Sequence, residues 1–130
     1  MNKKSQSSIE FVLILGVVIF FFMSFMVLIS INMSSTTNEK RDTAMNEIAH
    51  SISDEINLAS TSSGGYERNF QIPADILGLQ YNLTLSNNTL FLITEDGKHA
   101  VAYSVKNVQG TLNRGSNIIE NQNGTILLNP

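Results

Sequence analysis

Residues 5–31 read Ser-Gln-Ser-Ser-Ile-Glu-Phe-Val-Leu-Ile-Leu-Gly-Val-Val-Ile-Phe-Phe-Phe-Met-Ser-Phe-Met-Val-Leu-Ile-Ser-Ile. The 21 residues from Phe11 to Ile31 contain no charged side chain. A helical rise of about 1.5 Å per residue carries such a run across roughly 31 Å, the thickness of a bilayer core. The stretch therefore predicts one helix able to cross a membrane. Glu10 lies immediately before the apolar run, at a position where a carboxylate in lipid is costly and usually has a partner.

Two lysines, Lys3 and Lys4, precede the run, and the small residue Ser5 follows them. A secretory signal also has a basic head, but its apolar region is only about 7–15 residues long and ends at small residues. Here the apolar run is longer, and no Ala-x-Ala site follows it. Cleavage beside Ser5 would instead remove the basic head and keep the apolar helix.

The segment Lys-Lys-Ser-Gln-Ser-Ser-Ile-Glu-Phe at residues 3–11 resembles the archaeal class III signal peptide of type IV pilin-like proteins. That family has a basic pair, a small residue, then Gln-x-Ser-x-Glu-Phe and a hydrophobic helix. Four positions match the motif: Gln6, Ser8, Glu10 and Phe11. Ser5 is a departure, because the family usually has Gly before the cut. The resemblance covers residues 1–31.

The resemblance implies a scheme of processing and assembly. A prepilin peptidase would cut between Ser5 and Gln6, so that Gln6 carries the new N-terminal amine. Glu10 would neutralise the amine of an adjacent subunit, and Gln6, Glu10 and Phe11 would form the assembly end of the helix. The implied partners are further copies of the chain in a helical filament, the membrane before assembly, a pilus assembly ATPase and its platform protein.

Composition bounds the remaining possibilities. The chain has 130 residues, which suits one membrane helix and one small domain. Its net charge is −3, and loss of two lysines would change it to −5, so no basic footprint for nucleic acid is present. The absence of Cys excludes disulfides and thiol catalysis, and no cofactor is expected. The basic head, with a balanced Glu-Lys-Arg-Asp at 39–42, predicts a cytoplasmic N-terminus and an exported remainder.

The helical pattern continues after the apolar run. Residues 38–60 place apolar side chains three, four and seven apart, which predicts an amphipathic half of the same helix. The apolar stripe comprises Ala44, Met45, Ile48, Ala49, Ile52, Ile56 and Ala59. The other side carries Arg41, Asp42, Asn46, Glu47, Asp54 and Glu55. Residues 34–38 have poor helix propensity and are the weak point of the helix. The run Ser-Thr-Ser-Ser-Gly-Gly at 60–65 predicts its end.

Residues 66–130 have the pattern of β-structure. Two-residue turns within 86–89 and 95–98 predict a three-stranded antiparallel meander over residues 79–106. The first turn pairs Leu83 with Leu92, and the second pairs Leu92 with Val101, so both registers agree. They place on one face Tyr81, Leu83, Leu85, Leu90, Leu92, Val101, Tyr103 and Val105. The only available cover for this face is the helical stripe.

The other β segments are less regular. The opposite face of the meander is mixed, with Phe91 and Ile93 among Asn, Thr and Ala, which leaves cover by later chain or by a neighbour open. Residues 70–72 before Pro73 predict a short edge strand. Residues 117–120 and 125–129 predict a further hairpin around the turn at 121–124.

Few residues have the pattern of a chemical site. His50 and His99 lack metal-ligand spacing, and both are expected at the surface. No nucleophile elbow or Gly-rich phosphate loop is present in the sequence. Acceptor motifs for N-glycosylation occur at Asn32, Asn82, Asn87 and Asn123. The composition alone predicts about three such motifs, so four permit modification of an exported protein without indicating it.

The sequence thus predicts an α+β fold, with a long N-terminal hydrophobic helix packed on a small antiparallel β-sheet domain. The expected organisation is a cleaved leader (1–5), a long helix (6–63) and an extracellular β domain (64–130). The expected function is a non-enzymatic subunit of an archaeal type IV-like adhesion pilus, first in the cell membrane and then in a surface filament. The alternatives are a minor pilin or a membrane-anchored surface protein that does not polymerise. An archaellin is disfavoured by Glu10, and an anchored enzyme or receptor is a further, weaker alternative.

Overall fold

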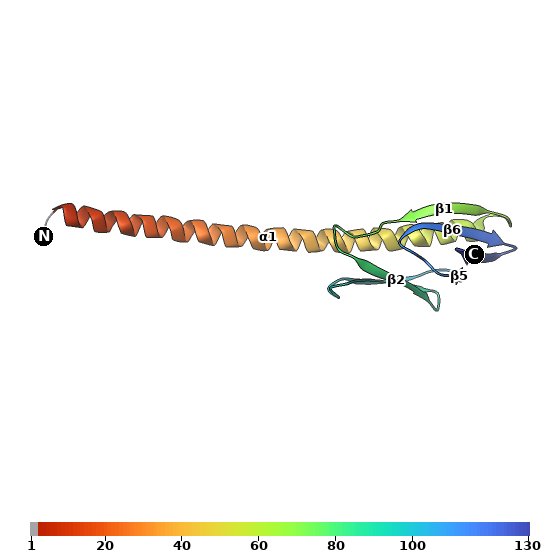
Figure 1. Cartoon of the computed structure of the whole chain (residues 1–130). Coiled ribbons are helices and arrows are strands. Elements are labelled where there is room, and N and C mark those ends of the chain that lie inside the picture. The colour runs from red at the N-terminus through yellow and green to blue at the C-terminus, as the bar shows by residue number, and fades with distance from the viewer. Residues whose placement is uncertain (1–2) are drawn as a thin grey trace. The chain divides into compact units, whose positions relative to one another are not determined.

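The structure is a computed structural model that describes residues 3–130, with only the backbone of residues 4 and 5. One long helix, α1 (Lys3–Thr61), is followed by seven strands (Figure 1). The strands are β1 (Glu67–Ile72), β2 (Tyr81–Ser86), β3 (Thr89–Thr94), β4 (Ala100–Ser104), β5 (Gln109–Gly110), β6 (Gly115–Gln122) and β7 (Thr125–Leu128). The chain divides into two units, Met1–Asn38 and Glu39–Pro130, and α1 contributes to both. This is the predicted α+β fold.

The predicted weak point of α1 is helical throughout residues 34–38. The hydroxyls of Thr36 and Thr37 donate to the carbonyl oxygens of Asn32 and Met33, both at 3.0 Å. These side chains therefore use the helix's own backbone as partner, which compensates in part for their low propensity. The helix ends at Thr61, within the predicted break.

The predicted meander is present with the predicted registers. Strands β2, β3 and β4 form one antiparallel sheet, in which Leu83 pairs with Leu92 and Leu92 with Val101. The turn between β2 and β3 has two residues, Asn87 and Asn88, with φ of 48° and 61°. Positive φ at both positions defines a type I′ turn, whose twist matches that of the flanking strands. Strand β3 ends at Thr94 and β4 begins at Ala100, so the second predicted turn, at residues 95–98, lies in the connection between the two strands.

A second, four-stranded sheet has the order β1-β6-β7-β5. Strand β1 is the predicted edge strand and ends just before Pro73. Strands β6 and β7 form the predicted C-terminal hairpin with a two-residue turn, Asn123 and Gly124. The short parallel pairing of β5 with β7 was not expected. It requires glycine at Gly110, because an added Cβ would lie 2.1 Å from the carbonyl oxygen of Leu128.

One hydrophobic core joins the second half of α1 to both sheets. In Figure 1 this half of the helix runs alongside the strands. The predicted stripe is buried except for the partly buried Ala44, with Met45, Ala49, Ile56 and Ala59 at 0% exposure. The meander adds Tyr81, Leu90 and Leu92, and the second sheet adds Phe70, Ile72, Ile119, Ile126 and Leu128. The core of residues 39–130 is therefore made without any side chain of residues 3–38.

Two polar side chains inside this core, those of Tyr81 and Asn121, have defined partners. The Tyr81 hydroxyl donates to the carbonyl oxygen of Pro73, and burial raises the pKa of Tyr81 to about 12, so the donor keeps its proton. The Asn121 amide donates to the carbonyl oxygens of Ala59 at 2.9 Å and Ser62 at 3.0 Å. The Ala59 carbonyl lies in the last turn of α1 and the Ser62 carbonyl lies just after it, where helical partners are lacking. Asn121 therefore caps the helix from β6.

Alternation in β3 gives a direct test of the fold. Leu92 is 1% exposed, whereas its neighbour Phe91 points outward and is 44% exposed. We expect Leu92→Asp to lower the free energy of unfolding by several kcal/mol, because it buries a charge without a partner. Phe91→Asp is the matched control, and we expect a change of no more than about 1 kcal/mol. Denaturant unfolding of the full chain in detergent micelles, followed by tyrosine circular dichroism, measures both; equal stability of the two variants would refute the register.

Candidate functional site

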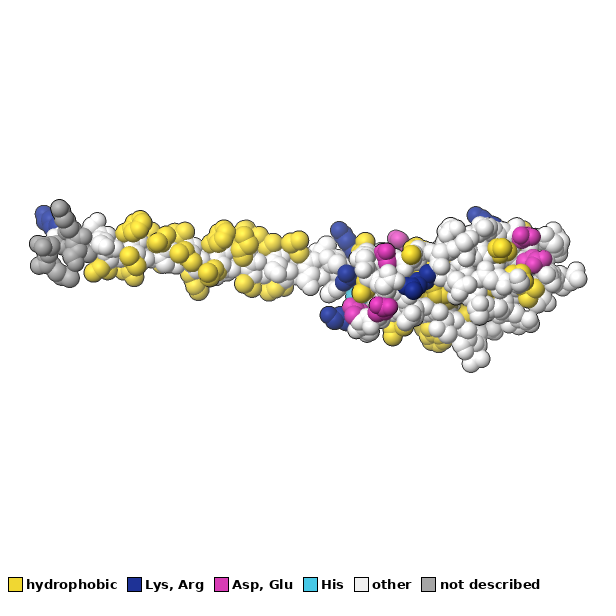
Figure 2. Space-filling view, viewed as in Figure 1, with side chains coloured by type: hydrophobic (Ala, Val, Ile, Leu, Met, Phe, Trp, Pro, Cys, Tyr) yellow, Lys and Arg dark blue, Asp and Glu magenta, His cyan; other side chains and the backbone are white. Residues whose placement is uncertain are grey.

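The apolar half of α1 is the first candidate site. It contains an 18-residue window with a mean hydropathy of 3.1, none of which is buried inside the structure. Phe11, Phe20, Phe21 and Met23 are each between 63% and 68% exposed. Figure 2 shows hydrophobic side chains along this half and most charged side chains over the part formed by residues 39–130. By length and composition the helix is able to cross a membrane, which makes it compatible with a membrane anchor.

The predicted assembly residues lie at the start of this half. Gln6, Glu10 and Phe11 are helical and exposed. Gln6 and Glu10 are four positions apart, so they lie on the same face of the helix. Among the residues that the structure describes, none forms an ion pair with Glu10. The structure thus brings Gln6 and Glu10 together on one face, with Phe11 beginning the apolar surface beside them.

The predicted processing bond joins Ser5 to Gln6. Its backbone lies within the first turns of α1, and the side chain of Ser5 is outside the described part. The first turn of a helix lacks internal partners for its backbone N–H groups and frays readily. A peptidase would therefore reach this bond by unwinding only the first turns.

A part-buried polar contact links α1 to the turn between β3 and β4. His99 Nδ1 lies 2.5 Å from Asp42 Oδ1, and the His99 side chain is only 6% exposed. The prediction of a surface histidine at position 99 was therefore wrong. The β3–β4 turn fixes the residue, because the backbone N–H of His99 donates to Thr94 Oγ1 and Thr94 N–H donates to the His99 carbonyl. Burial follows from this placement, which the spacing of His in the sequence does not reveal.

The hydroxyl of Thr94 also donates to Asp96 Oδ1 at 2.6 Å. This bond and the backbone N–H of Lys98 hold the pKa of Asp96 below its usual value. The turn that presents His99 is therefore braced by an ionised carboxylate. His50, in contrast, is exposed as predicted, pairs with Asp54 at 3.3 Å and stacks on Tyr103.

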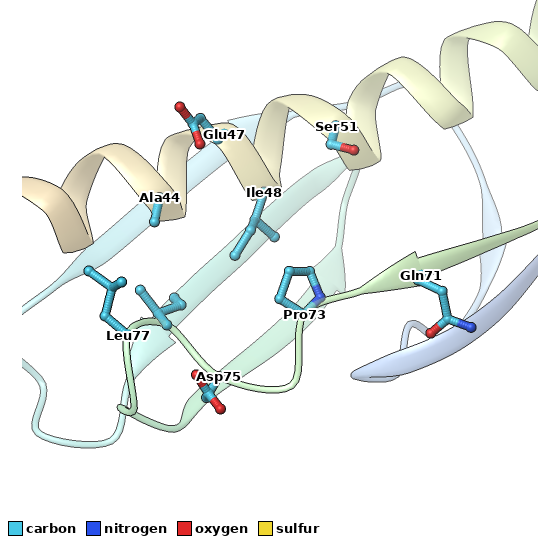
Figure 3. A pocket seen from close by; sticks show the side chains of 9 residues that line it. Ala44, Glu47, Ile48, Ser51, Gln71, Pro73, Asp75 and Leu77 are labelled. Carbon is cyan, nitrogen blue, oxygen red and sulfur yellow. The ribbon is translucent and has the colours of Figure 1, made fainter.

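A groove of about 440 Å³ lies between α1 and the loop from β1 to β2 (Figure 3). Ala44, Ile48, Pro73 and Leu77 face it, while Glu47 and Asp75 lie on opposite sides and point away from it. The carboxylates thus do not converge as an acid and base pair. Across residues 3–130, the described His, Asp and Glu side chains form no group of three suited to a metal ion. The groove offers apolar surface and no convergent chemistry.

The four glycosylation motifs occupy different elements. Asn32 lies in α1, one residue after the apolar run. Asn82 lies in β2, while Asn87 and Asn123 lie in the two type I′ turns. All four Asn side chains are exposed.

Sequence reasoning missed the polar residues that connect elements. Asp42 falls on the polar side of the helix by spacing, yet it reaches His99. Asn121 and Asn117 are 2% and 1% exposed, although both read as hairpin residues. The Asn117 amide is fully used, because it contacts Asn113, Gly115 and Asn129. A period-two alternation through 117, 119 and 121 is the signal that could have placed these side chains inward.

Comparison with known proteins adds no assignment, because no family model, no curated protein and no solved structure matches the chain. The functional argument therefore rests on the N-terminal motif and on the geometry of the two units. The apolar half of α1 supplies a surface that needs a cover. The unit of residues 39–130 supplies a domain with its own core.

The contact between Asp42 and His99 predicts a stability effect. Asp42→Ala removes the hydrogen-bond partner of His99 Nδ1, and we expect a loss of about 0.5–1.5 kcal/mol in the free energy of unfolding. Glu39→Ala removes an exposed carboxylate from the same helix and should change stability by less than about 0.5 kcal/mol. Denaturant unfolding in micelles compares the two. If Asp42→Ala were as stable as Glu39→Ala, the contact would not contribute to the fold.

Proposed function

We propose that this protein is the structural subunit of an archaeal type IV-like adhesion pilus. The observation that carries the proposal is the motif Gln6-x-Ser8-x-Glu10-Phe11 placed directly before 21 uncharged residues. In this proposal the chain is inserted in the membrane, trimmed before Gln6 and extracted into a filament. The apolar helices bundle as the filament core, and residues 64–130 lie outside.

The exposed apolar surface of α1 supports this proposal. Phe11, Phe22 and Phe25 are each at least 60% exposed, and water would cost about 25 cal/mol for every Å² of such surface. Lipid relieves this cost before assembly, and the helices of other copies relieve it afterwards. Packing among copies then exchanges one apolar surrounding for another, so extraction from the membrane does not expose the segment to water.

The carboxylate of Glu10 gives the assembly a register. Apolar packing alone lets helices slide along one another, because each position along the segment resembles the next. An unpaired carboxylate among apolar helices is costly. The amine of Gln6 from an incoming subunit is its natural counter-charge, and the cost of missing this pairing selects one axial position.

The independent core of residues 39–130 also supports the proposal. Its buried side chains all come from residues 45–128. The domain therefore keeps the same packing whether the apolar half of α1 is surrounded by lipid or by other helices. A subunit that moves between the two surroundings needs this independence.

The alternative is a minor pilin, or a membrane-anchored surface protein that does not polymerise. Both share the anchor and the outer domain, so they differ from the main proposal only in assembly. Electron microscopy of surface filaments, with mass spectrometry of their subunits, tests the proposal. We expect this chain to be a principal component of the filaments. Its retention in membranes while filaments are made of another protein would favour the alternative.

Processing gives a separate prediction. We expect the mature protein to begin at Gln6, either as free glutamine or in its cyclised form, because a cut after Ser5 removes the basic head and keeps the apolar helix. Mass spectrometry of the N-terminal peptide from the cell-surface pool measures this. An intact Met1 end in that pool would refute the prepilin proposal, and cleavage after residue 31 would indicate an ordinary secreted domain.

Glu10 gives the decisive variant. We expect Glu10→Gln and Glu10→Ala to leave insertion and processing intact and to reduce filament yield at least tenfold, since loss of a pairing worth about 1.4 kcal/mol already changes an equilibrium tenfold. Glu10→Asp keeps the charge on a shorter side chain and should be intermediate. The measurement is the ratio of processed protein in sheared filaments to processed protein in membranes.

Glu39→Gln is the matched control, because Glu39 is an exposed carboxylate of the same helix outside the apolar segment. It should leave this ratio unchanged. Normal filament yield from Glu10→Gln would show that Glu10 is an incidental interfacial residue.

A further inference from the structure

The outer face of the three-stranded sheet carries no charged side chain. Alternation along the strands turns outward Asn82, Thr84 and Ser86 of β2, Thr89, Phe91 and Ile93 of β3, and Ala100, Ala102 and Ser104 of β4. Phe91 and Ile93 are 44% and 46% exposed at its centre. The later strands leave Phe91 and Ile93 exposed, so they do not cover the centre of this face. A surface exposed to solvent normally carries charged side chains, which keep the protein soluble.

The size of this face argues against a protein as its sole cover. Three strands spaced by about 4.8 Å, with about five residue steps of 3.4 Å, give an area of roughly 240 Å². A stable protein interface buries about 800 Å² on each partner. The face is therefore too small to hold a second protein by itself, although it is large enough for a small ligand to lie on.

One glycosylation motif lies on this same face. Asn82 pairs with Ile93, and Thr84 pairs with Phe91, so the acceptor Asn and its hydroxyl partner stand beside the two apolar residues. Directly paired residues have Cβ atoms about 4.5–5.5 Å apart, and diagonal neighbours about 7–8 Å. A group attached to Asn82 therefore lies over Ile93 and beside Phe91. Ala100 and Ala102 continue these rows with small side chains and leave room for it.

The other three motifs have a structural reason for their Asn. Asn87 and Asn123 have φ of 48° and 53° in type I′ turns, where Asn is among the preferred residues. Asn32 adjoins the apolar segment, which the proposed filament buries. Asn82 lies within a strand, where Asn is disfavoured, and its side chain makes no hydrogen bond to any other described residue. The fold therefore gives Asn82 no role of its own.

We propose that Asn82 carries an N-linked saccharide, and that this saccharide covers Ile93 and Phe91. The carboxamide nitrogen of Asn82 forms a bond to the anomeric carbon of a sugar delivered on a lipid phosphate by an external transferase. The bond from that carbon to the phosphate oxygen breaks, the lipid phosphate leaves with the electron pair, and the carboxamide loses one proton. The C–H face of the sugar ring then packs on the apolar side chains while its hydroxyls remain in water. The inference rests on the proposed function only for the outward position of the domain.

The acceptor motif supplies matched variants for a test. Thr84→Ser keeps the hydroxyl of the motif, whereas Thr84→Ala removes it and leaves Asn82 in place. Full-length protein is purified from the membranes of the cells that make it. The tryptic peptide over residues 69–98 contains Asn82 and Asn87, and electron-based fragmentation separates them. We expect sugar mass on Asn82 in the wild type and in Thr84→Ser, and none there in Thr84→Ala or Asn82→Gln.

A second measurement tests the cover. Hydroxyl-radical labelling of Phe91 should rise at least threefold in Thr84→Ala relative to Thr84→Ser. Labelling of Phe70, which is 9% exposed, should remain equal in both and shows that the core is intact. Equal labelling of Phe91 in the two variants would refute the cover.

Other outcomes bear on the site itself. Bare Asn82 in the wild type overturns the inference, whether sugar is found on Asn87 or Asn123 or on no residue. Disulfide crosslinking between copies through Ala102→Cys, with Asn82 bare, would assign the face to a contact between copies instead. Because the protein comes from membranes, a sugar on Asn82 in cells without filaments upholds this inference while the pilus proposal fails. Asn82 without sugar in the subunits of confirmed filaments would support the pilus proposal and overturn the inference about Asn82.

Discussion

Burial of the apolar stripe of α1 is the interaction on which the folded unit depends. Met45, Ile52 and Ile56 are almost fully buried, and the strands of both sheets pack around them. Neither small sheet has a second layer of its own, and a sheet of three or four strands needs one to be stable. Full burial of an aliphatic side chain contributes about 1.5–3 kcal/mol, so the stripe supplies a large share of the driving force. The helix is thus the shared second layer of both sheets.

The same helix uses apolar side chains in two different ways along its length. Residues 45–59 have a one-sided stripe that the chain itself covers, whereas residues 11–31 are apolar on all sides and are not covered within their unit. An all-round apolar helix is stable only among lipid or other proteins. Residues 45–59 are therefore part of a folded domain, whereas residues 11–31 present an apolar surface that needs lipid or other proteins to cover it.

The sequence predicts the meander well and the polar connections poorly. Two tight turns with Asn-Asn and Asp-Gly constrain the registers of Leu83, Leu92 and Val101, since a slip at either turn would bring apolar and polar faces into conflict.

Local rules of this kind act over a few residues. The contact of Asp42 with His99 joins positions far apart in the chain, and so does the capping of α1 by Asn121. Such pairs depend on how elements pack in three dimensions, which spacing does not encode. The parallel pairing of β5 is missed for the same reason. At the N-terminus the motif predicts roles for Gln6 and Glu10, but a single chain lacks the neighbour on which those roles depend.

Capping of α1 by Asn121 also sets an order of events during synthesis. The last turn of the helix is made early, and its cap lies in a strand that is made 62 residues later. Strand β1 likewise cannot pair until β6 has been made, and the core is incomplete until Leu128 has been made. The domain therefore cannot close until nearly all of its residues have left the ribosome. The apolar segment, in contrast, precedes the domain in the chain and needs none of it to form its helix. In the proposed pilin, its insertion into a bilayer would precede folding of the domain and would fix the side on which that folding occurs.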